Sequence, residues 1–111
     1  MIQTVLKIKA SPHRLQDLIQ ALKSLMVSAQ AEHGLMGCRL YQPVGNETTL
    51  CYTEDWLTTD DLEYQIRSNR YTQLLALMET ATEPPSLEFR TVSHIQGLDY
   101  LQAVRSGAKT A

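Results

Sequence analysis

The sequence predicts a single α+β domain, a ferredoxin-like βαββαβ sandwich in which two helices cover one face of a four-stranded antiparallel sheet. Two observations lead to this fold class. Four short segments alternate apolar and polar residues with a period of two, as strands do, and two longer segments repeat apolar residues every three or four positions, as amphipathic helices do. A chain of 111 residues has the length of one such domain.

The first strand is expected over residues 2–9, and a helix follows it directly. Ser11 is the expected N-cap, and Pro12 fits the first helical position, where no amide hydrogen is needed. Gly34 is expected to close this helix in the left-handed conformation. The apolar stripe of the helix consists of Leu15, Leu18, Ile19, Leu22, Leu25, Met26 and Ala29.

A hairpin is expected next, with strands over residues 37–44 and 48–57 joined by a turn at Gly45-Asn46-Glu47. The period of two places Glu54 and Trp56 on the same face of the second of these strands. Cys38 and Cys51 lie inside the apolar runs, where small packed thiols are expected. A disulfide between them is the less favoured alternative.

Thr59 or Asp60 is expected to cap the second helical region. Its pattern is interrupted around Ser68-Asn69, which leaves open one bent helix or two short ones, and Pro84-Pro85 ends it. The fourth strand is expected over residues 87–95. Gly97 then separates the domain, residues 1–97, from a tail over 98–111 that begins as a short helix and is disordered from Ser106 onward.

Two helices can cover only one face of a sheet, so the other face needs a partner. Val5, Cys51, Val92 and either Tyr41 or Leu40 are expected to leave apolar area there. A second copy stacked on this open face would cover it, and symmetric dimers are the commonest oligomers. The sequence therefore predicts a homodimer.

Composition excludes several classes of partner. The net charge is −2 and the ten basic residues are scattered, whereas nucleic-acid-binding domains carry a clustered basic face. No apolar run approaches the roughly 20 residues of a membrane span, and the N-terminus does not read as a signal peptide. No His/Cys cluster has metal-ligand spacing. We therefore expect a cytoplasmic protein without a metal, a membrane or a nucleic-acid partner.

From Thr53-Glu54-Asp55-Trp56 onward, through Asp61-Leu62-Glu63, Arg67-Ser68 and Tyr71, the sequence resembles the antibiotic-biosynthesis-monooxygenase domain family. That family includes quinol monooxygenases and relatives that cleave haem. The similarity extends from the first strand to the fourth, and includes residues 37–41 and 74–79. It implies a dimeric α+β barrel with a pocket between helices and sheet in each protomer. Active members oxidise quinol or polyphenol substrates with O₂ and need no cofactor.

The chief departure from the family is Gln65, where members often carry a histidine. A glutamine side chain cannot take up a proton near neutral pH and is a poor iron ligand. Haem cleavage is therefore disfavoured, and a monooxygenase would need another base, for which Glu54 and His94 are the candidates. The resemblance places Trp56, Leu62, Gln65 and Tyr71 on the pocket wall.

Simpler readings exist for most of these residues. Trp56 is also suited to a core, Glu54 to pairing with Arg39 or Arg90 across the sheet, and His94 to the surface. Two functions follow, a cofactor-independent monooxygenase of quinol or polyphenol substrates and a non-catalytic homodimer that binds a small aromatic ligand. A third, purely structural role would have the pocket filled by Met26, Met78 and Tyr71. The apolar tail is expected to pack on the partner protomer.

Overall fold

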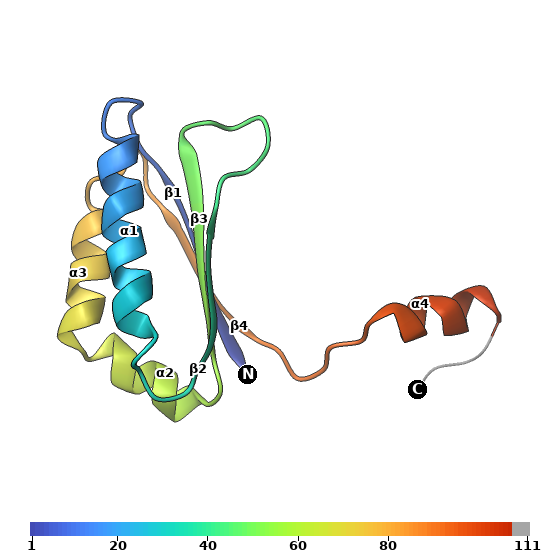
Figure 1. The fold of residues 1–111 in the computed structure, drawn as a ribbon. Coiled ribbons are helices and arrows are strands. Elements are labelled where there is room, and N and C mark those ends of the chain that lie inside the picture. Colours follow the sequence, from blue (N-terminus) through green and yellow to red (C-terminus); the bar gives the residue numbers. More distant parts are fainter. Residues whose placement is uncertain (108–111) are drawn as a thin grey trace.

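The computed structural model describes residues 1–107, and its architecture is the predicted one. Its elements are β1 Ile2–Lys9, α1 Leu15–Ala29, β2 Leu35–Tyr41, β3 Thr49–Trp56, α2 Thr59–Ile66, α3 Asn69–Met78, β4 Ser86–Thr91 and α4 Leu98–Arg105. The four strands form one antiparallel sheet in the order β2-β3-β1-β4. Helices α1, α2 and α3 lie on one side of this sheet (Figure 1), so the ferredoxin-like α+β class is confirmed.

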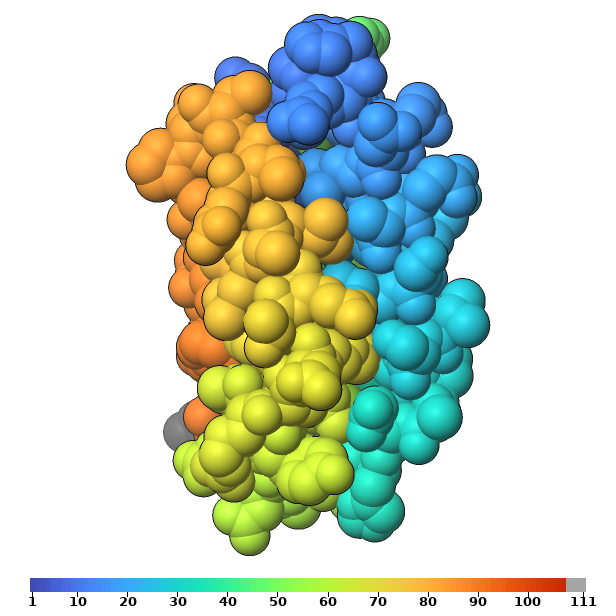
Figure 2. Space-filling view, turned by 90° about the vertical axis from the view of Figure 1, so that its left-hand side faces the viewer, coloured from blue at the N-terminus to red at the C-terminus, as the bar shows by residue number. Residues whose placement is uncertain are grey.

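The core lies between the sheet and the helices. Leu6 pairs with Tyr52 and Ile8 with Leu50 in the β1–β3 register, and all four side chains are buried on the helix-covered face. The apolar stripe of α1 meets them through Leu18, Leu22 and Leu25, and α3 adds Tyr71 and Leu74. Figure 2 shows the outer surface of the helical layer, with α3 beside α1 along most of its length.

Several element ends differ from the sequence prediction, including both ends of β2, which runs from Leu35 to Tyr41 and was expected over residues 37–44. Helix α1 begins at Leu15, because residues 12–14 form a separate turn in which the Arg14 amide donates to the Ser11 carbonyl oxygen at 3.0 Å. The N-cap of α2 is Thr58, whose Oγ1 accepts from the amide of Asp61 at 3.1 Å. Strand β4 ends at Thr91, which pairs with Ile2, the first residue of β1. Beyond it only Val92 still bonds to the sheet, its amide donating to the Met1 carbonyl oxygen at 2.8 Å.

The interruption at Ser68 separates two short helices, which was one of the two alternatives. The Ser68 side chain caps α3 by accepting from the Tyr71 amide at 3.3 Å. Its hydroxyl also donates to the Gln65 carbonyl oxygen at 2.6 Å, near the end of α2. Ser68 therefore terminates one helix and starts the next, which is what serine side chains do when they bond to nearby backbone.

Gly34 has the expected left-handed backbone, with φ of +84°. Gly34 does not close α1, because that helix already ends at Ala29. It lies instead where the α1–β2 loop meets α2, and a Cβ at this position would stand 2.2 Å from Asp61 Oδ2. The glycine therefore serves both a strained backbone angle and a close approach between two segments.

The open face of the sheet is more polar than the sequence predicted. Tyr41, rather than Leu40, shares this face with Cys51 and Val5. Asp55 also lies there, accepting from Gln3 Nε2 at 3.0 Å and pairing with Arg39 at 3.4 Å. The remaining charged residues of the face are Lys7, Lys9, Glu88 and Arg90. Cys38 and Cys51 are free thiols, as expected.

After Thr91 the chain leaves the sheet and extends away from it as far as α4, on the side opposite the other helices (Figure 1). None of the residues of α4 is buried. The predicted disorder from Ser106 to Ala111 falls mostly on residues 108–111, which lie outside the described residues. Within residues 1–107, no helix combines the length and the apolar character needed to span a membrane.

Candidate functional site

A cluster of polar and aromatic side chains is buried beneath the helices, around the second half of β3. This buried polar cluster consists of Tyr52, Glu54, Trp56, Gln65, Arg70 and Tyr71. Tyr52, Glu54 and Trp56 alternate along β3 and therefore share its helix-covered face. Gln65 comes from α2, and Arg70 and Tyr71 come from the first turn of α3.

The ion pair between Glu54 and Arg70 is the centre of the cluster. The Glu54 side chain is 1% exposed and that of Arg70 is 9% exposed. Arg70 donates to Glu54 Oε2, to the Tyr52 hydroxyl at 2.9 Å and to the Leu25 carbonyl oxygen of α1 at 3.0 Å. The Tyr52 hydroxyl in turn donates to Glu54 Oε2. Buried charges need a partner and further hydrogen bonds, and this network supplies both.

The sequence prediction paired Glu54 with Arg39 or Arg90, and that pairing is wrong. Arg39 lies on the open face with Asp55, and Arg90 pairs with Glu88 on the same strand at 2.8 Å. The sequence does indicate that Arg70 faces the core, because Arg70 precedes the core residues Leu74 and Leu77 by four and seven positions. An arginine at helical spacing with core leucines points inward, where it needs a buried carboxylate.

Burial and the Glu54 charge fix the protonation of the neighbouring groups. Burial, followed by the Glu54 carboxylate, raises the pKa of Tyr52 far above its ordinary value, and the same two causes raise the pKa of Tyr71 to about 12. Burial lowers the pKa of Arg70, but its hydrogen bond to Glu54 and the charge of that residue outweigh this, and the net pKa is raised. Both phenols and the guanidinium therefore stay protonated at neutral pH.

Four members of the cluster each have a buried polar atom without a partner in the described protein. Two are donors, Trp56 Nε1 and the Tyr71 hydroxyl, and two are acceptors, Glu54 Oε1 and Gln65 Oε1. Buried polar groups are nearly always hydrogen-bonded, so four such atoms on one side of one strand call for an explanation. A polar molecule bound among them would satisfy both kinds of atom.

The residues predicted for the pocket wall are all buried in the structure. Trp56, Leu62, Gln65 and Tyr71 are 0%, 6%, 1% and 4% exposed. Gln65 Nε2 donates to Glu32 Oε2 at 2.8 Å, which ties α2 to the α1–β2 loop. Of the two candidate bases, Glu54 is in the cluster, whereas His94 is exposed in the segment after β4 and is not brought to it.

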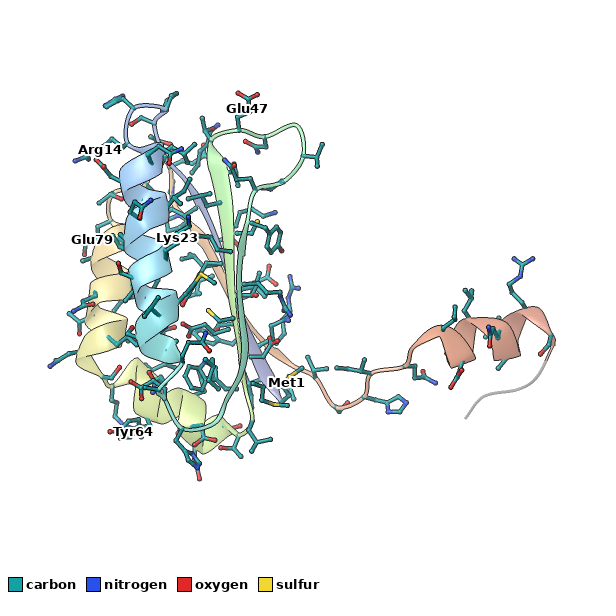
Figure 3. All side chains as sticks on the ribbon, in the orientation of Figure 1. Met1, Arg14, Lys23, Glu47, Tyr64 and Glu79 are labelled. Carbon is teal, nitrogen blue, oxygen red and sulfur yellow. The ribbon has the colours of Figure 1, made fainter. Side chains whose placement is uncertain are left out.

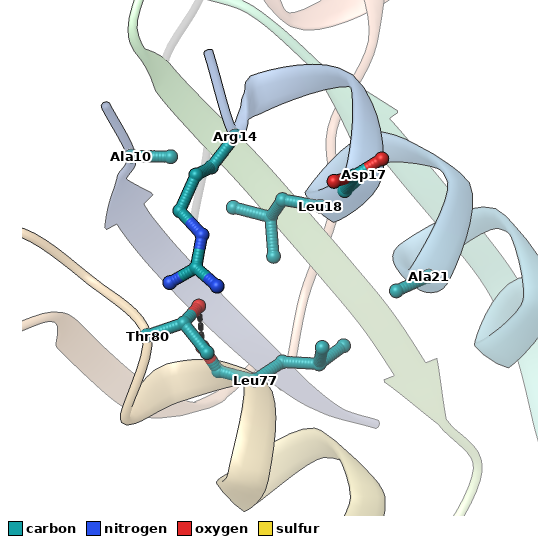
Figure 4. A pocket seen from close by; sticks show the side chains of 7 residues that line it. All are labelled: Ala10, Arg14, Asp17, Leu18, Ala21, Leu77 and Thr80. Atoms are coloured by element: carbon teal, nitrogen blue, oxygen red, sulfur yellow. Dashed lines mark hydrogen bonds between the residues drawn. The ribbon is translucent and has the colours of Figure 1, made fainter. Parts of the chain in front are cut away.

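Two hollows on the surface of the helical layer lie away from the buried polar cluster. One of about 260 Å³ opens between α1 and α3 and is lined by Ala10, Arg14, Asp17, Leu18, Ala21, Leu77 and Thr80 (Figure 4). A second, of about 280 Å³, continues along the same two helices past Ala21 and Leu77 toward Ser28 and Gln73. Neither hollow includes Trp56, Gln65 or Tyr71, so the buried polar cluster is closed off from both.

Comparison with solved structures relates the fold to a known class. A conserved protein from Methanosarcina mazei Go1 is 24% identical, with a TM-score of 0.74 over 80% of this chain and 89% of that one. Two proteins, from Deinococcus radiodurans and Nitrosomonas europaea, both carry the name "putative antibiotic biosynthesis monooxygenase". They are 13% and 15% identical, with TM-scores of 0.80 and 0.74, and cover 87% and 85% of this chain and 97% and 100% of theirs.

No protein-family model matches the chain, and no curated protein matches it either. What the solved structures share with this chain at such low identity is the fold. The resemblance to the antibiotic-biosynthesis-monooxygenase domain is therefore confirmed at the level of architecture, from the first strand to the fourth.

Proposed function

We propose that this chain is a cofactor-independent monooxygenase that oxidises a quinol or polyphenol with O₂ in the buried polar cluster. The observation that supports it is the set of four unpartnered buried atoms, two donors and two acceptors, which lie beside the apolar core. Apolar walls with a few convergent polar groups are the usual make-up of a site for a small aromatic molecule.

Each unpartnered atom has a role toward a phenolic substrate. Glu54 Oε1 accepts the proton of the substrate hydroxyl, while Oε2 stays bound to Arg70 and Tyr52. Trp56 Nε1 and the Tyr71 hydroxyl then donate to the oxyanion that results, and their hydrogen bonds favour it in a site from which water is excluded. Gln65 Oε1 accepts from a second hydroxyl and orients the ring.

The chemistry after proton loss belongs to the substrate. A quinol that has lost its proton donates electrons to O₂. One oxygen atom bonds to a ring carbon, and the other leaves as water, so that quinol and O₂ give a hydroxyquinone and water. The reaction is balanced without an external reductant. The protein's part is to hold the phenolate, exclude water and orient the carbon that reacts.

Access requires movement of α2, because its residues Leu62 and Gln65 close the cluster from outside. Two side-chain contacts hold α2 to the loop after α1, Gln65 with Glu32 and Asp61 with His33 at 3.0 Å. The His33–Asp61 contact lies at the surface, whereas Gln65 is buried, so opening α2 breaks one exposed contact and one part-buried hydrogen bond. Lid motions of this kind are common in enzymes that exclude water.

The fold also supports a homodimer, through the open sheet face. That face presents cations on Lys7, Arg39 and Arg90 and anions on Asp55 and Glu88, so that a second copy related by a two-fold axis can place opposite charges together. The apolar share of the contact is provided by Val5 and Tyr41.

The test is oxygen uptake by purified, metal-free protein with a panel of hydroquinones and polycyclic phenols. We expect protein-dependent uptake that falls at least tenfold in Trp56→Phe, which keeps an aromatic ring and removes the indole donor. Tyr64→Phe on the exposed side of α2 is the matched control and should leave uptake unchanged. Equal activity of Trp56→Phe and the parent protein would overturn this placement of the reaction.

A second function, a non-catalytic carrier of small aromatic molecules, is favoured by one observation. Position 65 carries an amide that cannot take a proton, and one oxygen of Glu54 is committed to Arg70. The two functions separate in one experiment because Trp56 is the only tryptophan. A phenol that quenches its fluorescence without any oxygen uptake identifies the carrier, and quenching together with uptake identifies the enzyme.

A further inference from the structure

The C-terminal arm, residues 92–107, carries large apolar side chains that are more than half exposed in the part of the chain that the structure describes. Leu98, Leu101 and Val104 are 65%, 52% and 51% exposed, and their spacing of three residues puts them on one side of α4. Ile95, just before the helix, is 74% exposed. Figure 3 shows the side chains of α4 standing clear of the sheet and of the other helices.

An isolated arm of this kind is not self-supporting. Helices shorter than about 12–15 residues are marginal in water without tertiary contacts, and α4 has eight residues. The stripe of α4 therefore needs a surface to pack on. The helical layer of its own chain is on the other side of the sheet, since the arm leaves β4 toward the open face (Figure 1).

The length and direction of the arm allow it to reach a second copy stacked on the open face. Residues 92–97 are six residues without helix or strand and can span up to roughly 20 Å. Stacked sheets lie about 10 Å apart. An arm that leaves on the open-face side can therefore pass the sheet of a second copy stacked there and bring α4 to the level of that copy's helices.

We propose that α4 of each protomer packs, through Leu98, Leu101 and Val104, on a second copy of this chain, so that two arms clasp the dimer reciprocally. The proposal rests on the homodimer of the proposed function and adds the contact that holds it. The open face carries at least as many charged side chains as apolar ones, so it buries little apolar area by itself. The arms supply the apolar contact that a stable dimer requires.

The first measurement is the dimer dissociation constant of the full chain by sedimentation equilibrium. Leu98→Asp with Leu101→Asp places two charges in the stripe and should raise the dissociation constant at least 100-fold, with an unchanged thermal unfolding profile of the protomer. Gln102→Glu adds a charge elsewhere on the same helix and should leave the constant unchanged. An unchanged constant in the double variant overturns the clasp and leaves the stacked dimer standing.

The second measurement distinguishes packing of α4 on a second copy from packing of α4 on its own chain. A photoreactive phenylalanine at position 101 of the full chain should give a covalent dimer on irradiation. A crosslink within one chain, or none, overturns the clasp. A parent protein that stays monomeric at all concentrations overturns the clasp and the homodimer together, whereas oxygen uptake and tryptophan quenching report on the buried polar cluster independently.

Discussion

Arg70 on α3 and Glu54 on β3 form an ion pair that is nearly sealed from solvent and also reaches a backbone carbonyl of α1. One guanidinium therefore joins both long helices to the sheet at the level of the candidate site. Because the same guanidinium binds Glu54 through Oε2, the other oxygen of that carboxylate has no hydrogen-bond partner among the described residues. The contribution of the pair to stability and the proposed role of Glu54 in oxidation can be measured separately.

Arg70→Leu should lower the free energy of unfolding by about 3–5 kcal/mol, because it leaves the Glu54 carboxylate buried without a countercharge. The double variant Glu54→Leu with Arg70→Leu should lose less than the sum of the two single variants. Urea unfolding of the four proteins in this cycle measures the coupling. Arg90→Leu removes an exposed partner of Glu88 and should change stability by less than about 1 kcal/mol. A cycle without coupling would contradict the buried pair.

Gly34→Ala should be destabilising for two reasons, the left-handed backbone angle and the contact of the added Cβ with Asp61. Gly45→Ala separates these two effects. Gly34 and Gly45 have almost the same φ, +84° and +85°, but a Cβ on Gly45 meets nothing within 4 Å, whereas one on Gly34 meets Asp61. Gly45→Ala should therefore cost about 1–2 kcal/mol for the backbone alone. Gly34→Ala should cost clearly more in thermal unfolding. Equal costs would mean that Asp61 can move aside freely.

Acid should loosen the contact between α2 and the loop after α1. The hydrogen bond from His33, followed by that from Thr58, holds the pKa of Asp61 below its ordinary value. A lowered folded-state pKa stabilises the protein above the unfolded-state value, and that stabilisation is lost as pH falls from about 4 through the folded-state pKa. Asp61→Asn should remove this part of the stability-versus-pH curve, and Asp60→Asn, on the exposed side of the same turn, should keep it. Identical curves for Asp61→Asn and the parent would refute the role of the pair.

Gln65→His should raise oxygen uptake if the buried polar cluster is a site of oxidation. An imidazole at this position can accept a proton near neutral pH, which the amide cannot, so the uptake should gain a dependence on pH between about 5 and 8. Gln65→Leu has a similar volume without polar atoms and should not gain activity. A parent protein that is already active and unaffected by Gln65→His would show that proton transfer runs through Glu54.

Local sequence patterns predicted most of the fold because each element carries its own signal. Alternation located the four strands, and the leucine spacing located α1. What failed were ends that depend on distant partners. The end of β4 is set by where β1 begins, and no pattern within residues 86–95 contains that information. The cap of α2 moved by one residue, which is within the usual uncertainty of helix ends.

The burial of the candidate residues was predictable from the sequence, whereas the partner of Glu54 and the closure of the cluster were not. The family resemblance and the phase of β3 placed Trp56, Gln65 and Tyr71 inside. The partner of Glu54 was mispredicted because strand alternation indicates only cross-strand neighbours, whereas Arg70 reaches Glu54 from helix α3. Closure of the cluster depends on how α2 packs at the end of β3, a tertiary property that residue spacing does not encode.

All eight residues of β3 are buried within a single protomer, although helices cover only one of its faces. The strands on either side, with side chains such as Lys7 and Arg39, shield the open-face half of β3. Amide hydrogens of β3 should consequently exchange with solvent at rates that do not vary with protein concentration. In the proposed dimer each subunit would therefore fold before it associates, and folded subunits could exchange between dimers.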